Sequence, residues 1–296
     1  MRTSPAQIPF VKAHGLGNDF LLVEESALAE LERSALAMAI CDRHTGVGAD
    51  GIVVLGASAS ATACFRIYNS DGSEATLSGN ALRCAAAWLL KKREAPARDG
   101  EVIALETRVG VRELTYLRRE GPAWILRAEI GQPSFAAADV PFRPPSGLTR
   151  AGPIVDFPLP AGDVTVPVTV LSMGNPQCIT FVEDFAAVDW RGLGAEIERH
   201  PYFPDRANVG FVRVLDDSRI EARFWERGAG HTLASGTGSC ACAVAAHLAG
   251  KTGRRVTVQL ELGALEVVWR DDGMIELTGP AEITAEGIFH WRKEPT

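Results

Sequence analysis

Short apolar runs separated by turn-forming residues are the main pattern of this chain, and they predict many strands and few helices. In the first half, such runs predict strands at 8–13, 20–23, 52–55 and 64–68, and a strand-rich region from 101 to 130. In the second half, they predict strands at 164–171, 177–182, 209–214, 220–225, 256–262, 265–269 and 288–291. Many strands beside isolated helices indicate an α+β fold.

Three segments place apolar residues at helical spacing instead. The first runs from 27 to 43, with Ser26 as its expected N-cap. The second, 80–92, and the third, 236–249, are rich in Ala and apolar on most sides, and Gly250 is expected at the C′ position of the third. We expect the second and third helices to be enclosed by sheet.

The two halves of the chain repeat each other at an offset of 157 residues. The pairs that share this offset are Ser78 with Ser235, Asn18 with Asn175, and Asn69 with Glu226. We therefore expect two pseudo-symmetric domains, each a barrel-like sheet around a central apolar helix, with a ligand-binding cleft between them. The expected domains are 1–138, completed by a C-terminal strand within 286–296, and 139–285, with a proline-rich linker at 136–152.

Composition narrows the class of protein. The 296 residues are 46% hydrophobic and 23% charged, which is ordinary for a globular chain. A net charge of −7 without a long basic block argues against a nucleic-acid partner. No apolar run reaches the roughly 20 residues of a membrane helix and no signal-peptide core is present, so we expect a cytoplasmic protein without a membrane partner. The six cysteines lack a C-x-x-C pair and predict buried thiols, with no metal site.

The repeated Ser-Gly-(Asn/Thr) turns are the candidate chemistry. Each turn lies where a buried helix is expected to begin, so its backbone N–H groups are free to bind a carboxylate. Ser78 and Ser235 would then lie on opposite faces of the ligand, although each serine could also serve only as an N-cap. The polar residues expected around the ligand are Asn18, Asn69, Asn175, Asn208, Glu226 and Arg227, the last suited to a second carboxylate.

Six ordered motifs make the chain resemble the diaminopimelate epimerase family. They are His14–Phe20, Asn69–Glu74, Gly79–Asn80, Met173–Pro176, Arg206–Gly210 and Glu226–Gly230. The resemblance implies a cofactor-independent, cytoplasmic and homodimeric isomerase that interconverts LL- and meso-diaminopimelate in lysine and cell-wall precursor biosynthesis. It also implies that an amino-acid substrate is held by Asn18, Asn69, Asn175, Asn208, Glu226 and Arg227, with backbone groups of Gly79, Asn80, Gly236 and Thr237.

The chain departs from the family pattern at three positions. The family uses two cysteines as its acid–base pair, and here both positions are serine, Ser78 and Ser235; a family histidine is replaced by Gln177. A thiol with a pKa of about 8.5 supplies thiolate near neutral pH, whereas a serine hydroxyl needs an adjacent base. Glu226 and His231 are the candidates beside Ser235, and we predict Ser78, Ser235 and Glu226 as the catalytic set.

The departures leave several functions open. The chain could be an altered isomerase that acts on diaminopimelate or on another amino acid. It could also be a catalytically silent relative that binds an amino acid, or a Cys-to-Ser variant made to trap substrate. Retention of the Asn, Glu and Arg set favours an amino acid with a distal carboxylate as the ligand in each case.

Overall fold

A computed structural model of the chain describes residues 6–28, 31–136, 138–145 and 152–291, and it divides the chain into two compact units. Unit 1 comprises residues 1–128 and 279–296, and unit 2 comprises residues 129–278. The boundaries between the units, at 128/129 and 278/279, differ from the expected domain boundaries at 138/139 and 285/286. They fall inside strands β8 (Ala123–Gly131) and β17 (Ile275–Trp291), which pass from one unit to the other without a turn that the sequence pattern could reveal.

Unit 1 is a closed barrel of eight strands. Its strands pair in the order β1, β2, β3, β4, β6, β7, β8 and β17, and β17 closes the ring by pairing with β1. The pairing of β1 with β17 is antiparallel from Ala6–Trp291 to His14–Glu282. The remaining strands of unit 1 are β1 (Ala6–Gly15), β2 (Asn18–Glu24), β3 (Gly51–Gly56), β4 (Ala63–Asn69), the short β5 (Glu74–Ala75), β6 (Val102–Thr107) and β7 (Gly110–Glu120).

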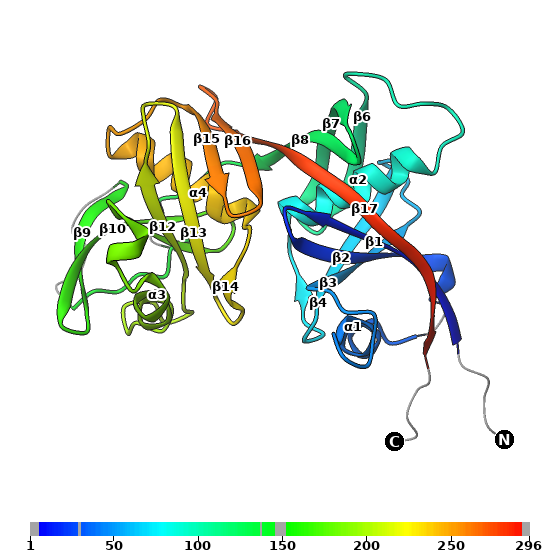
Figure 1. Ribbon diagram of the computed structural model, residues 1–296, viewed down its shortest axis with the longest axis horizontal. Helices are drawn as coiled ribbons and strands as arrows, with labels where there is room; N and C mark the ends of the chain where they lie inside the picture. Colours follow the sequence, from blue (N-terminus) through cyan, green and yellow to red (C-terminus); the bar gives the residue numbers. More distant parts are fainter. Residues whose placement is uncertain (1–5, 29–30, 137, 146–151, 292–296) are drawn as a thin grey trace. The chain divides into compact units, whose positions relative to one another are not determined.

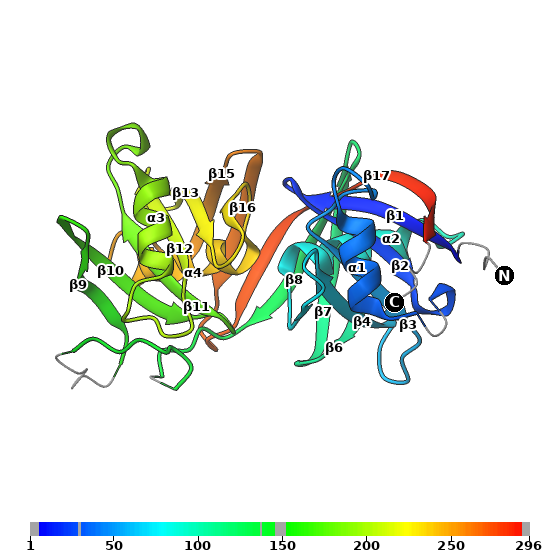
Figure 2. The same cartoon turned by 90° about the horizontal axis from the view of Figure 1, so that it is seen from below.

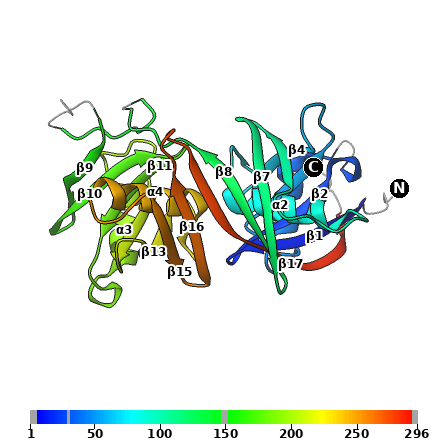
Figure 3. The same cartoon turned by 90° about the horizontal axis from the view of Figure 1, so that it is seen from above.

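Helix α2 (Gly79–Lys91) is the central helix of unit 1 and packs against β1, β2, β3 and β7. Figure 3 shows it among the barrel strands. Leu82, Ala85 and Ala86 are fully buried, which agrees with the enclosed apolar helix expected at 80–92.

Helix α1 (Arg33–Cys41) lies on the outside of the barrel against β3 and β4, as Figure 2 shows. The expected bounds of 27–43 and the Ser26 cap were wrong. Residues Glu25–Ala27 form a separate 3-10 turn, and the carboxylate of Glu32 caps α1 by accepting hydrogen bonds from two backbone N–H groups of the first turn. A carboxylate also interacts favourably with the positive end of the helix dipole.

Unit 2 repeats the plan with a sheet in the order β9, β10, β11, β12, β13, β15, β16 and β17, and the pairings between described residues leave this sheet open. Helix α4 (Gly236–Leu248) packs against β10 to β13, β15 and β16, and α3 (Trp190–Glu198) packs on β12 and β13 (Figure 1). The strands are β9 (Ile154–Ala161), β10 (Val164–Ser172), β11 (Pro176–Phe181), β12 (Asn208–Val214), β13 (Arg219–Glu226), β14 (Gly230–Thr232), β15 (Arg255–Leu260) and β16 (Gly263–Trp269); a 3-10 turn spans Phe185–Ala187.

The repeat found in the sequence holds for whole elements. Helix α4 spans Gly236–Leu248 and α2 spans Gly79–Lys91, so both ends differ by 157 residues. The same offset relates α3 to α1. Helix α3 was not predicted, although the offset applied to the first predicted helix would have indicated one near it. Gly250, expected at the C′ position of the third helix, has a φ of 68°.

The proline-rich segment around 136–152 was expected to be a linker, but it belongs to unit 2. Val140 and Phe142 are 2% and 5% exposed in the core of that unit, so the described part of the segment is packed rather than free. Residues 137 and 146–151 lie outside the described residues. In the described part of the chain, no helix is both long and apolar enough to cross a bilayer.

Candidate active site

Ser235 lies at the N-cap of α4 and has a carboxylate partner. Its backbone is extended, and its Oγ accepts a hydrogen bond from the N–H of Gly238 at 3.1 Å, which is ordinary N-capping. The same hydroxyl donates to Oε1 of Glu226 at 2.6 Å. Ser235 is 4% exposed and Glu226 is partly buried, so this is a short, partly buried hydroxyl–carboxylate pair, with the geometry of a nucleophile or acid beside its base.

His231 was the other candidate base for Ser235, but its side chain contacts Glu261 and Trp190 instead. Its Nε2 lies 2.7 Å from Oε1 of Glu261, and its ring stands edge-on to Trp190 at 5.1 Å between centroids. Glu226 is therefore the group hydrogen-bonded to Ser235.

The remaining candidates of unit 2 are joined through strand β11 and its neighbour. The parallel register of β11 and β12 sets Gln177 opposite Asn208. The amide nitrogen of Gln177 donates to Oδ1 of Asn175 at 2.9 Å and lies 3.4 Å from the Oγ1 of Thr237 in the first turn of α4. Asn208 in turn accepts from the N–H of Arg227 at 2.9 Å. Thr237 and Arg227 follow Ser235 and Glu226 closely in the sequence, so these contacts lie beside the Ser235–Glu226 pair.

Arg227 and Asn175 also line a common hollow of 540 Å³ in unit 2. The guanidinium of Arg227 donates to the carbonyl of Asp205 at 3.0 Å through Nη1. A guanidinium carries five N–H donors in all, so the group retains donors for an acidic ligand. The residues around the hollow are Ala138, Asp139, Pro141, Gly174, Asn175, Pro176, Asp205 and Arg227.

Ser78 occupies the matching position in unit 1 but has a different environment. It is the N-cap of α2, and its Oγ accepts from the N–H of Ala81 at 3.3 Å. Within the described ranges, no hydrogen bond joins Ser78 to a carboxylate or an imidazole. Ser78 and Ser235 therefore share the same N-cap backbone conformation, but Ser235 alone of the two has a carboxylate partner among the described residues.

A chain of side-chain hydrogen bonds supports the start of α2. Asn80 donates to Oδ1 of Asn18 at 2.9 Å, and Asn18 donates to Oδ2 of Asp50 at 2.7 Å. Arg83, which is fully buried, donates to Oδ1 of Asn80 and to the carbonyl of Pro280. Asn18 and Asn80 are 62 residues apart in the sequence, and the fold brings their side chains into contact.

Asp50, the acceptor for Asn18, is held in place by ion pairs. Arg43 bridges Asp50 and Asp19, and Lys12 also pairs with Asp19. Burial alone would raise the pKa of Asp19, but the hydrogen bonds from Arg43 and Lys12 outweigh it and lower that pKa. These charges fix the carboxylate that holds Asn18.

Asn69 is the predicted residue least connected to the others. Its side-chain amide donates to Oγ of Ser73 at 2.9 Å, within its own turn. The following N–H, that of Ser70, donates to the carbonyl of Asp50, so Asn69 lies near the group that supports Asn18.

The cysteines do not offer a substitute for the missing thiols. Burial raises the pKa of Cys84, in α2, to about 12, and it raises the pKa of Cys242, in α4, as well. A thiol in such a place stays protonated and unreactive at neutral pH. In the described residues, no group of three or more His, Cys, Asp or Glu side chains is arranged to hold a metal ion.

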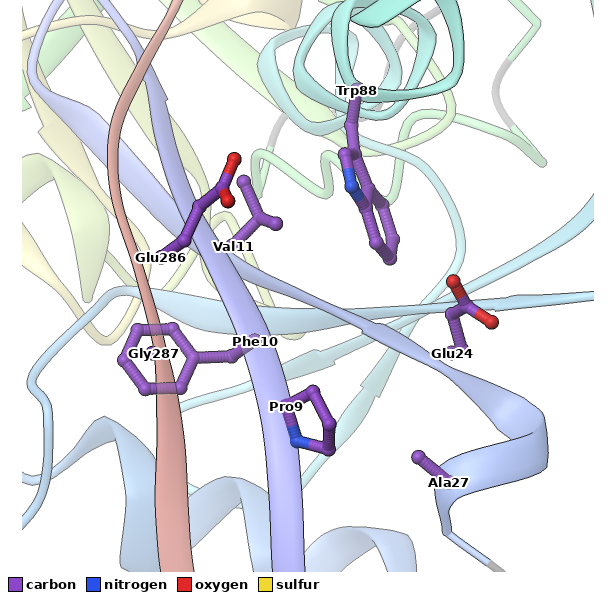
Figure 4. Close-up of a pocket in the computed structure, with 8 residues that line it drawn as sticks. All are labelled: Pro9, Phe10, Val11, Glu24, Ala27, Trp88, Glu286 and Gly287. Carbon is purple, nitrogen blue, oxygen red and sulfur yellow. The ribbon is translucent and has the colours of Figure 1, made fainter. Parts of the chain in front are cut away.

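A second hollow, of 330 Å³, lies in unit 1 away from the predicted site residues (Figure 4). Its wall combines the apolar Phe10 and Trp88 with the carboxylates of Glu24 and Glu286. Ion pairs from neighbouring lysines occupy both carboxylates. We assign no part of the site to it.

Comparison with known proteins identifies the family of the chain. A family model described as diaminopimelate epimerase matches residues 10–135 and 169–284, which cover both repeats. A diaminopimelate epimerase of Pelotomaculum thermopropionicum is 43% identical over 285 residues, 96% of this chain and 99% of the relative. One from Desulforudis audaxviator is also 43% identical, over 281 residues, 94% of this chain and 98% of the relative.

Two solved structures share the fold at low identity. A hydroxyproline epimerase from Agrobacterium vitis has a TM-score of 0.68 at 14% identity and covers 99% of this chain and 95% of its own. A predicted epimerase from Pseudomonas aeruginosa has a TM-score of 0.68 at 18% identity, and the match covers 95% of this chain and 98% of that protein. A family model that covers both repeats and relatives that match over nearly the whole length show that the chain belongs to the diaminopimelate epimerase family.

Proposed function

We propose that this chain is an isomerase that interconverts LL- and meso-diaminopimelate by moving the α-proton without a cofactor. The observation that carries the proposal is the Ser235–Glu226 pair at the head of α4, inside a retained set of polar substrate-binding residues. Relatives named diaminopimelate epimerase, which match the chain over nearly its full length, support the choice of substrate. In this proposal, Arg227 binds the distal carboxylate of diaminopimelate. The first-turn N–H groups of α2 and α4 bind its α-carboxylate.

In the proposed reaction, Ser235 and Glu226 act as one unit. The α-proton passes to the Oγ of Ser235 while the hydroxyl proton of Ser235 passes to Glu226, so the dyad gains one proton and the substrate becomes a carbanion. The helix N-termini offset the charge that develops on the substrate carboxylate. Ser78 donates its hydroxyl proton to the other face of the carbanion, which inverts the configuration. Ser78 then recovers a proton from solvent, and Glu226 releases to solvent the proton that it gained.

The difference between the serines makes the proposed reaction asymmetric. Ser235 is hydrogen-bonded to a carboxylate, whereas the contact observed for Ser78 is its cap to Ala81. Proton removal by the Ser235 dyad should therefore be faster than removal by Ser78. One stereoisomer is expected to lose its α-proton to solvent faster than the other.

A second function, binding of an amino acid without turnover, is favoured by a specific observation. Gln177 stands where the family has a histidine, and its amide nitrogen donates to Asn175 and contacts Thr237. An amide does not titrate near neutral pH, so this position holds neighbouring side chains in place and moves no proton.

Hydrogen–deuterium exchange at the α-carbon separates the two functions. The protein is incubated with LL- or with meso-diaminopimelate in D₂O beside the Ser78→Cys/Ser235→Cys double variant. Deuterium uptake catalysed by the unaltered protein, faster for one isomer, is the expected result. Uptake with the cysteine variant alone would leave a binding protein with an intact pocket, and uptake with neither would refute the substrate.

We also propose that the chain works in the cytoplasm as a homodimer. All six cysteines are free thiols, as in proteins of reducing compartments, and the dimer rests on the family resemblance alone. Light scattering across a dilution series would give a constant mass of twice 31.7 kDa if the dimer is stable.

A further inference from the structure

We propose that Glu198 is a positioning residue that holds the turn 226–230 in place for the reaction. The turn carries both the proton acceptor Glu226 and the substrate-binding Arg227, so this inference rests on the proposed function. Glu198 is the last residue of α3, and its side chain is 3% exposed. It does not belong to any of the motifs recognised in the sequence.

The carboxylate of Glu198 binds the turn on both sides of the two functional residues. Its Oε1 accepts from the N–H of Gly228 at 2.9 Å, and its Oε2 accepts from the indole N–H of Trp225 at 3.1 Å. Trp225 precedes Glu226 and Gly228 follows Arg227 along the chain. A shift of this carboxylate would therefore move both functional residues together.

Charge keeps Glu198 in the state that this contact needs. Burial alone would raise its pKa, but the N–H groups of Gly228 and Trp225, together with the nearby guanidinium groups of Arg199 and Arg206, lower the pKa overall. Glu198 is thus ionised at neutral pH and acts purely as an acceptor. Glu198 is not among the residues that line the 540 Å³ hollow beside Arg227, so its role is to fix the turn rather than to transfer protons.

The close packing of α3 on β13 gives the contact its rigidity. A Cβ at Gly194 would lie 2.7 Å from the Cβ of Trp225, so the helix can approach the strand only because this residue is glycine. A glutamate one turn further along α3 then reaches the turn without an intervening layer. A glutamine of the same shape would present an N–H group toward one of the two donors and lose half of the contact.

The test compares Glu198→Gln with Val258→Ala, a control of similar expected stability loss. Val258 is fully buried and pairs with Ile220, which lies near the start of β13, whereas Glu226 is the last residue of that strand. In Glu198→Gln we expect the backbone amide of Gly228 to exchange with solvent about tenfold faster, since a hydrogen bond to a charged group is lost. We also expect kcat for α-proton exchange to fall about tenfold and KM to rise, because both functional residues lose their support. Val258→Ala should lower the melting temperature and leave these three readouts unchanged.

Two results would overturn the inference: Gly228 exchange in Glu198→Gln equal to that of the unaltered protein, or kinetic changes equal to those of Val258→Ala. The amide-exchange arm needs no substrate. If the unaltered protein does not exchange α-protons, the proposed function fails while the comparison of Gly228 exchange still decides whether Glu198 holds the turn.

Discussion

Replacing the two N-cap serines by alanine should destabilise the protein unequally, and the expected difference follows from their contacts. Ser235→Ala removes an N-cap bond of 3.1 Å and a hydrogen bond of 2.6 Å to Glu226. An N-cap is worth about 1 kcal/mol, and a hydrogen bond to a carboxylate about 1.5 kcal/mol at the lower end of its range. Ser78→Ala removes only a longer cap of 3.3 Å, worth about 0.5–1 kcal/mol.

The expected loss in free energy of unfolding is therefore about 2–3 kcal/mol for Ser235→Ala and under about 1 kcal/mol for Ser78→Ala. Urea denaturation at pH 7 followed by circular dichroism measures both. A double-mutant cycle with Glu226→Ala, which removes the acceptor, isolates the contact between Ser235 and Glu226, with an expected coupling of about 1.5 kcal/mol. Equal losses for the two serines, or a coupling near zero, would refute the assignment of Glu226 as the partner of Ser235.

Three further predictions concern the support of Asn18 and Asn80 in unit 1. Asp50→Asn should raise KM severalfold with little change in stability, because Asn18 loses a charged acceptor; steady-state kinetics test this, and an unchanged KM contradicts it. Arg83→Met should lower the free energy of unfolding by about 2 kcal/mol or more, since the buried oxygen of Asn80 loses its donor; an unaltered urea midpoint would count against it. The pKa of Asp19 is lowered in the folded state, so its ionised carboxylate stabilises the fold above pH 3.8, and this contribution is lost as the pH falls through the lowered pKa. Asp19→Asn should therefore flatten the dependence of the urea midpoint on pH below about 4.

The central helices could be predicted from local sequence signals, whereas α3 could be inferred only from the 157-residue offset. Helices α2 and α4 start at serine N-caps and continue through small apolar residues, so both local signals agree. Helix α3 contains Gly192 and Gly194, which weaken the helical pattern. Gly194 is required by the approach of Trp225, a tertiary contact that has no local signature.

Among the site contacts, those within one short segment could be predicted from the sequence, and those between distant residues could not. The partner of Ser235 was narrowed to Glu226 or His231 because the three lie in one short segment, and the structure selects Glu226. The contacts of Asp50 with Asn18 and of Glu198 with Gly228 join residues 32 and 30 positions apart. Such pairs depend on strand register and helix packing, which apolar spacing alone does not specify.

Strand β17 has a consequence for the order in which the molecule can be assembled during synthesis. Its residues 282–291 pair with β1, so the first strand of unit 1 meets a partner that is translated after all of unit 2; the hydroxyl of Thr284 bonds a carbonyl 272 positions earlier. Unit 2 is continuous in sequence and can form first, whereas the barrel of unit 1 stays open with β1 lacking one neighbour. An unpaired strand edge invites association with other chains, so nascent or truncated forms lacking residues 282–291 should depend most on chaperones.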